Sequence, residues 1–278
     1  MFLDSDDSRP LLDVKRENGR ELAESFKQLL SEEHPEQTYQ RYLEQHTQLI
    51  PRDFEQNHGI HFELAIRKLP FGADFVSDFF FLSKSSDDWN CVFIELESPH
   101  ASLFRGNSNN LSAKLLAGIN QIDTWRAWLS SGANQAHFTE TTIGPLRHPL
   151  GQNPCFMKYI LVIGRRREYE ENELRRATIR AKEREDFKIL TYDSLMENLD
   201  RKFPLYVGSR TNSGIDLLSD KLVGSSIFGW LAPELIGVNN VLLEQIKAHR
   251  TNEYRNSPEG GGFKDAFRVV ENRLRLLR

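Results

Sequence analysis

Two apolar runs that carry carboxylates constrain this chain most. Asp78 lies within the first run, residues 77–82, and a second run leads into Glu95 and Glu97. Residues i and i+2 of a β-strand share a face, so Glu95 and Glu97 would point the same way while Leu96 turns to the core. If the two strands pair with each other, three carboxylates meet at one place.

Three like charges on a largely buried sheet repel each other strongly. Proteins relieve such repulsion by raised carboxyl pKa values or by binding a hard cation through oxygen ligands. The sequence therefore predicts a divalent-metal site for Mg²⁺, with Mn²⁺ as a possible substitute. The alternative is an edge strand whose acids face water, but the nearly continuous apolar character of both runs argues against it.

The charge balance limits the classes of partner. The chain of 278 residues has a formal charge of -4 and a pI near 6.1, which argues against a uniformly basic coat for nucleic acid. No stretch approaches the roughly 18 consecutive apolar residues of a membrane span, and the acidic start does not resemble a signal peptide. We expect a cytoplasmic protein with no membrane partner, and neither a disulfide nor a zinc site for Cys91 and Cys155.

Periodicity predicts alternating helices and strands after a polar, irregular stretch that ends near residue 18. The predicted helices cover residues 22–30, 35–50, 111–130, 168–186 and 192–201. The predicted strands lie near residues 61–69, 74–83, 90–98, 159–164 and 187–190. Residues 131–154 are predicted to be a loop, because Gly, Pro and Asn are scattered through them.

This order predicts an α/β fold in three parts. We place an N-terminal arm and helix at residues 1–34, a core at 35–202 and a C-terminal extension at 203–278. Near the end, apolar residues recur every three or four positions between Phe263 and Leu277, which predicts an amphipathic helix. Its apolar face must be covered, either by the core or by another subunit.

Several spaced blocks resemble the Shedu antiphage defence proteins. The blocks are residues 42–44, 95–99, 103–104, 112–115, 121–126, 162–165 and 190–195. The likeness covers roughly residues 36–200, in the right order. The broader layout, an Asp on one strand, an acid-x-residue triplet on the next and a polar residue on the following helix, resembles the PD-(D/E)xK nuclease superfamily. That superfamily usually has lysine where this chain has Glu97.

The resemblance implies a mixed sheet flanked by helices, with helical additions at both ends, and a metal-dependent DNA endonuclease acting as a dimer or tetramer in defence against phage. The roles that it implies are catalysis for Asp78, Glu95, Glu97 and Gln121, and metal binding for Asp78, Glu95, the Leu96 carbonyl and Glu97. Glu97 cannot replace a lysine, so it would hold a second metal or serve as base for the attacking water. Glu36 and Glu44, on the helix before the sheet, are weaker candidates to join the site.

Basic side chains would hold the DNA phosphates. Lys114 and Gln121 are seven residues apart and so share a helix face, where Lys114 could supply the positive charge that Glu97 lacks. Arg165, Arg166 and Arg167 follow a strand at the rim of the sheet, and their guanidinium forks suit phosphate. For each of these residues the alternative is a solvated charge, with the arginines balanced by neighbouring glutamates.

Other functions have less support. No Walker loop, no dinucleotide fingerprint after Gly164 and no serine-hydrolase elbow occurs, so we expect no nucleotide cofactor. The main alternative to a nuclease is a nuclease-fold module that has lost turnover and serves in DNA binding or oligomerisation. The missing lysine favours that alternative, whereas retention of all three acids favours catalysis, because carboxylates beside a polyanion are costly without a metal.

Overall fold

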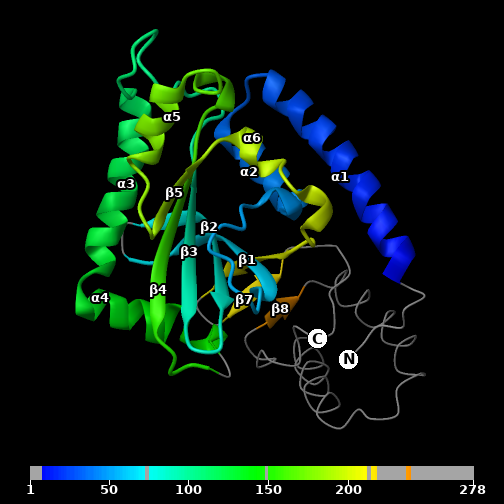
Figure 1. The fold of residues 1–278 in the computed structure, drawn as a ribbon. Coiled ribbons are helices and arrows are strands. Elements are labelled where there is room, and N and C mark those ends of the chain that lie inside the picture. The colour runs from blue at the N-terminus through cyan, green and yellow to red at the C-terminus, as the bar shows by residue number, and fades with distance from the viewer. Residues whose placement is uncertain (1–7, 73–74, 148–149, 212–213, 218–235, 239–278) are drawn as a thin grey trace. The chain divides into compact units, whose positions relative to one another are not determined.

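The computed structural model describes residues 8–72, 75–147, 150–211, 214–217 and 236–238. It is an α/β fold, and Figure 1 shows its helices and strands. The predicted apolar stripe of residues 263–277 lies outside the described residues. Among those that are described, no helix is both long and apolar enough to cross a membrane.

The α-helices are α1 (Ser8–Ser31), α2 (Glu36–Gln45), α3 (Ala113–Leu129), α4 (Gly132–His137), α5 (Glu173–Arg180) and α6 (Tyr192–Leu195). Single turns are Thr47–Leu49, Phe138–Thr142, Gly144–Leu146, Arg166–Glu168 and Leu199–Arg201. The strands are β1 (Ile60–Pro70), β2 (Val76–Lys84), β3 (Trp89–Leu96), β4 (Cys155–Val162), β5 (Phe187–Leu190), β6 (Tyr206–Arg210), β7 (Ile215–Leu217) and β8 (Ile236–Val238).

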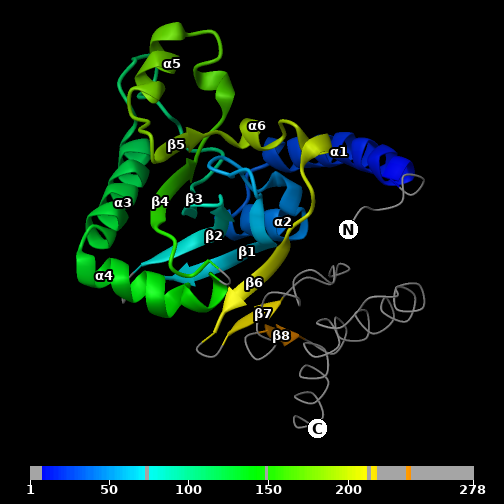
Figure 2. The same cartoon turned by 60° about the horizontal axis from the view of Figure 1, so that its bottom comes forward.

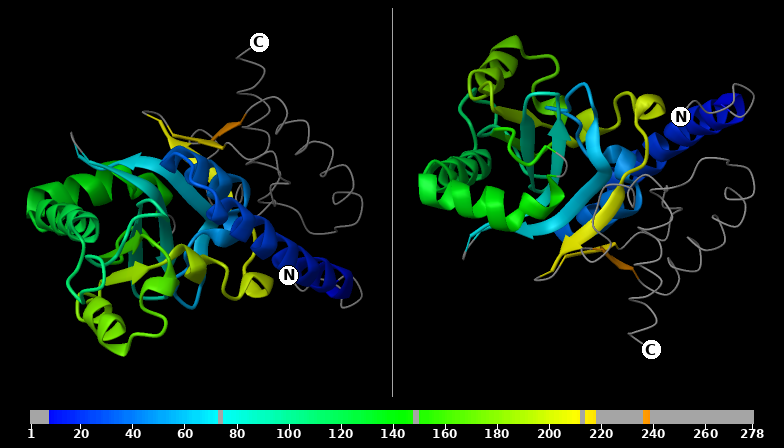
Figure 3. Two further views of the ribbon diagram at one scale, coloured as in Figure 1. Left: turned by 90° about the horizontal axis from the view of Figure 1, so that it is seen from above. Right: turned by 90° about the horizontal axis from the view of Figure 1, so that it is seen from below.

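The strands form a mixed eight-stranded sheet in the order β5-β4-β3-β2-β1-β6-β7-β8. β1 runs antiparallel to β2 and parallel to β6 on its other side. β4 and β5 are parallel, β6 and β7 antiparallel, and β7 and β8 parallel. Figure 2 labels β6 and β7, and the view from below in Figure 3 shows β6, in yellow, running beside β1.

The chain divides into two compact units that interleave along the sequence. The first unit comprises residues 1–53, 94–123 and 159–204, and the second comprises 54–93, 124–158 and 205–278. The division after residues 34 and 202 that the sequence suggested stays a prediction. β3, β4 and α3 have residues in both units, and each unit is described here by itself.

Each unit has its own aromatic core. In the first, Phe26 of α1 stacks on Tyr42, and Tyr192 packs edge-on against Tyr39. In the second, the ring of Phe93 lies among several other aromatic side chains. Its neighbours there include Phe71, Phe80, Trp125 and Phe138, with ring centroids 4.8 to 6.4 Å away.

Several parts of the sequence fold differently from expectation. The helix predicted over residues 168–186 is shorter, because α5 covers only Glu173–Arg180. α1 begins at Ser8, so the polar stretch that we expected to be irregular up to residue 18 is helical from that point. Residues 131–154 contain α4 and two further helical turns, because their scattered apolar residues Phe138, Ile143 and Leu146 are buried. β6 and β7 were not predicted as strands.

Candidate active site

Glu95 and Glu97 share one face at the end of β3, within the first unit. The backbone N–H of Glu97 donates to the Val162 carbonyl at 2.8 Å, so the strand pairing with β4 continues through this residue. Leu96, between the two acids, is buried with 1% of its surface exposed. Side chains of α3 contact both glutamates, which confirms the predicted alternation.

Gln121 of α3 binds Glu95 directly. Its side-chain Nε2 donates a hydrogen bond to Glu95 Oε1 at 2.6 Å. An amide donor at this distance fixes the orientation of the carboxylate without neutralising its charge. This is the residue that the resemblance selected from the helix following the acidic strand, and the structure brings it to the predicted acid.

Lys114, in the first turn of α3, forms an ion pair with Glu97. Its Nζ lies 2.6 Å from Glu97 Oε2, and the Glu97 side chain is only 10% exposed. The pKa of Lys114 is raised, chiefly by its interaction with Glu97 and further by the charges of Glu36 and Glu95, although partial burial acts in the opposite direction. Lys114 is therefore a charged group at neutral pH that faces the acids and is not simply solvated.

Two local features place α3 close enough for these contacts. Ser112 caps the helix, because its Oγ accepts a hydrogen bond from the Leu115 N–H at 3.0 Å. Gly118 lies where the helix meets the sheet: a Cβ there would stand 3.0 Å from Leu161 Cδ2 and 3.7 Å from Glu97 Cγ. The absent side chain lets the helix backbone approach Leu161 of β4, beside Glu97.

Asp78 lies in the second unit, on β2, and is 4% exposed. Its partner is Lys68 of β1, whose Nζ forms an ion pair with Asp78 Oδ1. Arg67 pairs with Phe79 and Leu69 with Ser77 in the ladder, so Lys68 and Asp78 stand opposite each other. Lys68 has a left-handed backbone with φ of 45°, which is uncommon for a residue other than glycine.

Sequence reasoning did not find Lys68. The strand register that puts it opposite Asp78 is set by a bulge between Ile60 and Ala65, which no local pattern reveals. The only available signal was a pair of adjacent basic residues, Arg67 and Lys68, within the otherwise apolar stretch of residues 64–69.

The donors in the first unit suit a hard divalent cation. Carboxylate oxygens are the ligands that Mg²⁺ prefers, and the acidic surroundings that raise the pKa of Lys114 would also attract a metal ion. Within the described ranges, no group of three or more His, Cys, Asp or Glu side chains is arranged to hold a metal. The three-carboxylate site that joins Asp78 to Glu95 and Glu97 therefore stays a prediction, as does the Leu96 carbonyl ligand.

The two weaker acidic candidates, Glu36 and Glu44, have different surroundings. Glu36 contributes to the electrostatic field at Lys114, which connects it with the acids of β3. Glu44 instead accepts a hydrogen bond from Gln40 Nε2 at 3.0 Å, one turn away on α2.

The guanidinium of Arg165 is engaged in hydrogen bonds within the first unit. Its guanidinium donates to both Asp193 oxygens at 2.8 to 3.1 Å and to the Leu30 carbonyl at 3.1 Å. Burial raises the pKa of Asp193, but the hydrogen bonds from Arg165 and from the Arg166 N–H together lower it by more. The net shift of this pKa is downward. This fork joins the end of α1 to the start of α6.

The other two arginines of the cluster differ in exposure. Arg166 forms an ion pair with Glu197 and donates to Ser194 Oγ at 3.2 Å, whereas Arg167 is exposed. The acids that balance the cluster are thus Asp193 and Glu197. Glu168, one of the neighbouring glutamates that the alternative reading would use, instead accepts hydrogen bonds from the backbone N–H groups of Leu103 and Phe104.

Comparison with known families identifies a family for this chain. The family model described as Shedu protein SduA, C-terminal, matches residues 33–196, more than half of the chain. The match includes both glutamates of β3, α3 and the arginine cluster. No curated protein matches the chain.

Proposed function

The chain belongs to the Shedu family of antiphage defence proteins, and we propose that it acts in that defence as a divalent-metal-dependent DNA endonuclease. The observation that supports catalysis best is the meeting of four side chains in the first unit. Glu95 lies on β3 and Glu97 directly after it, while Lys114 and Gln121 reach them from α3 at 2.6 Å each. An acid pair can hold a hard cation and an ammonium group can face a phosphate, so this group suits metal-assisted phosphodiester hydrolysis.

Each side chain has a distinct role in this proposal. A bound Mg²⁺ would polarise the scissile phosphate and lower the pKa of a water molecule. Glu95 offers its carboxylate oxygens to the metal, and Gln121 keeps that carboxylate in one orientation. Lys114 presents positive charge to the phosphate. In the nucleases that this chain resembles, a lysine at the place of Glu97 would do so. We propose Asp78 as a further metal ligand.

Glu97 has two possible functions in this scheme. Its carboxylate could bind a second cation, or it could accept the proton of the attacking water at Oε2, the atom that now faces Lys114. We further propose that Arg167 contacts the DNA backbone and that the protein acts as a homo-oligomer.

One observation favours the alternative, a DNA-binding module without turnover. Each predicted catalytic acid already has a polar partner from the protein: Lys68 for Asp78, Gln121 for Glu95 and Lys114 for Glu97. Two of these partners carry positive charge, so the acids are partly neutralised without a metal. Such a site could bind nucleic acid without cleaving it.

Cleavage of plasmid DNA separates the two functions. We would incubate the full chain with supercoiled and linear DNA in Mg²⁺, in Mn²⁺ and in a chelator. Cleavage that requires metal and is lost in Glu95→Gln, while binding and thermal stability persist, supports the nuclease. Glu185→Gln is the matched control, because Glu185 is exposed and lies outside the cluster. DNA binding without cleavage in any metal would support the alternative.

A further inference from the structure

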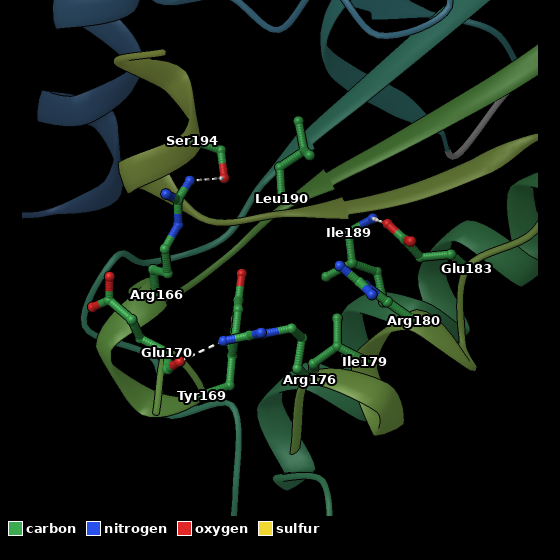
Figure 4. Close-up of a pocket in the computed structure, with 10 residues that line it drawn as sticks. All are labelled: Arg166, Tyr169, Glu170, Arg176, Ile179, Arg180, Glu183, Ile189, Leu190 and Ser194. Atoms are coloured by element: carbon green, nitrogen blue, oxygen red, sulfur yellow. Dashed lines mark hydrogen bonds between the residues drawn. The ribbon is translucent and has the colours of Figure 1, made fainter. Parts of the chain in front are cut away.

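The first unit contains a pocket that the acidic cluster does not use. It has a volume of about 440 Å³ and is lined by residues from the turn after β4, from α5, from β5 and from α6. This volume is within the range of about 300 to 1,000 Å³ that is usual for small-molecule sites. Figure 4 shows its ten lining side chains, none of which belongs to the group formed by the acids of β3, Lys114 and Gln121.

Arginine side chains give the pocket its charge, although one of them, Arg166, already forms an ion pair with Glu197. Arg176 and Arg180 are four residues apart on α5 and so lie on one face of the helix, while Arg166 approaches from the turn after β4. Two like charges at this helical spacing repel each other unless an anion lies between them. Arg176 donates to the Glu170 carbonyl, a neutral acceptor. Arg180 forms no ion pair with any residue that the structure describes.

The two acids of the lining do not cancel this charge. Glu183 is already engaged, because it accepts a hydrogen bond from the Ile189 N–H at 3.1 Å and lies 3.7 Å from Lys188 Nζ. The carboxylate of Glu170 is turned away from the guanidinium groups of Arg176 and Arg180 (Figure 4). The inner part of the pocket therefore presents guanidinium groups and the Ser194 hydroxyl to a ligand.

The rest of the lining is aromatic and apolar. Tyr169 stands in the middle of the group, between Arg166 and Arg176 (Figure 4). Ile179 and Ile189, which are 5% and 6% exposed, form an apolar floor with Leu190. An aromatic ring beside an apolar floor suits a planar base, and guanidinium forks suit phosphate oxygens.

We propose that this pocket binds a free mononucleotide, with its phosphate on Arg176 and Arg180 and its base against Tyr169. No phosphate-binding loop precedes the site, because side chains of a helix and a turn supply the contacts. The sequence, in which we found no nucleotide motif, therefore gave no indication of it. This proposal does not depend on the nuclease activity.

Calorimetric titration of the full chain, without DNA or metal, tests the proposal. The probes are adenosine 5′-monophosphate, adenosine, inorganic phosphate and an oligonucleotide without terminal phosphates. We expect the monophosphate to bind at one site per chain, at least about tenfold more tightly than adenosine or phosphate, since a charge-assisted hydrogen bond contributes about that factor. Equal affinity for phosphate alone, or binding of the oligonucleotide only, would overturn the proposal.

Variants locate the binding. Arg180→Gln should weaken the monophosphate about tenfold or more, and Tyr169→Leu should weaken it while Tyr169→Phe, which keeps the ring, should not. Arg41→Gln is the charge-matched control, because Arg41 is exposed on α2 and outside the pocket. Thermal unfolding shows whether each variant is folded. Unchanged affinity in folded Arg180→Gln would refute the site and leave the nuclease proposal untouched.

Discussion

Lys68 and Asp78 face each other across the antiparallel β1–β2 ladder and form an ion pair, although 45% of the lysine side chain is exposed and only 6% of the aspartate. The lysine thus reaches in from solvent to a carboxylate that lies within the sheet. A buried charge whose partner is removed is strongly unfavourable, and exposure of the other partner reduces that cost. The pair therefore gives Asp78 a counter-charge within an apolar strand.

Lys68→Met should lower the free energy of unfolding by about 1 kcal/mol at neutral pH, because Asp78 loses its counter-charge. If Asp78 is a metal ligand, added Mg²⁺ should raise the free energy of unfolding of this variant by more than it raises that of the parent. Chemical denaturation with and without Mg²⁺ measures both effects. Lys182→Met, at an exposed position, is the control. Equal stability of Lys68→Met and parent would mean that the ion pair is energetically neutral.

Glu97→Gln should reduce cleavage about 100-fold or more if the carboxylate serves a metal or the attacking water. DNA binding should be unchanged or tighter, since a negative charge near phosphate is removed. Cleavage rate and DNA affinity are measured on the same preparation. A variant that cuts as fast as the parent would remove Glu97 from the mechanism.

Exchanging the charges of Glu97 and Lys114 tests their pairing. Glu97→Lys alone places two ammonium groups together and should destabilise the fold by about 1 to 3 kcal/mol, the usual range for a single destabilising substitution. Adding Lys114→Glu should recover most of that stability, because opposite charges again face each other. Cleavage by Glu97→Lys itself would show that the lysine common in similar nucleases is compatible with this site.

Gln121→Glu should place a second carboxylate against Glu95, where the amide now lies. Repulsion between the two carboxylates then raises their pKa above that of an unfolded Glu, which is about 4.3. The variant therefore loses most stability at pH 7, and this loss disappears as the pH falls through about 4 and the carboxylates become protonated. Unfolding free energies between pH 4 and 7 should show the variant converging on the parent at low pH. A difference in unfolding free energy between variant and parent that does not change with pH would contradict the contact between Gln121 and Glu95.

Lys202 gives a prediction at alkaline pH. Burial, together with repulsion from Arg52, lowers its pKa to about 8, despite attraction from Asp53 and Glu197. As the pH rises, Lys202 loses its proton at about pH 8 in the folded state but only at about pH 10.4 in the unfolded state. The cost of burying its charge therefore decreases between about pH 8 and about pH 10.4, and the contribution of Lys202 to stability rises. Lys202→Met should be more stable relative to the parent at pH 7 than at pH 10. A constant difference across this interval would show that Lys202 titrates normally.

The short-range part of the candidate site was predictable from the sequence. Period-two alternation placed Glu95 and Glu97 on one face, and the spacing of seven residues placed Lys114 and Gln121 on one face of a helix. The contacts of that helix with both acids follow from these two periodicities once the helix packs on the strand.

Long-range pairing was not predictable. Lys68 meets Asp78 only through the register of β1, which a bulge sets, and the guanidinium of Arg165 is bound by an aspartate 28 positions later. Arginines that look available for DNA on local grounds are thus partly used for structure. The helical turns of residues 131–154 were missed because their apolar residues are too widely spaced to form a clear helical period.

The pairing of β1 with β6 has a practical consequence for anyone who trims this protein. Leu64 to Arg67 pair with Tyr206 to Ser209, and this partner strand lies beyond the region that matches the family. A fragment trimmed to that match would leave the backbone N–H and C=O groups along this side of β1 exposed to water, next to buried Leu64 and Ile66. Such an open edge recruits strands from other molecules, so aggregation of the shortened protein would reflect where it was cut and not an inability of the family region to function.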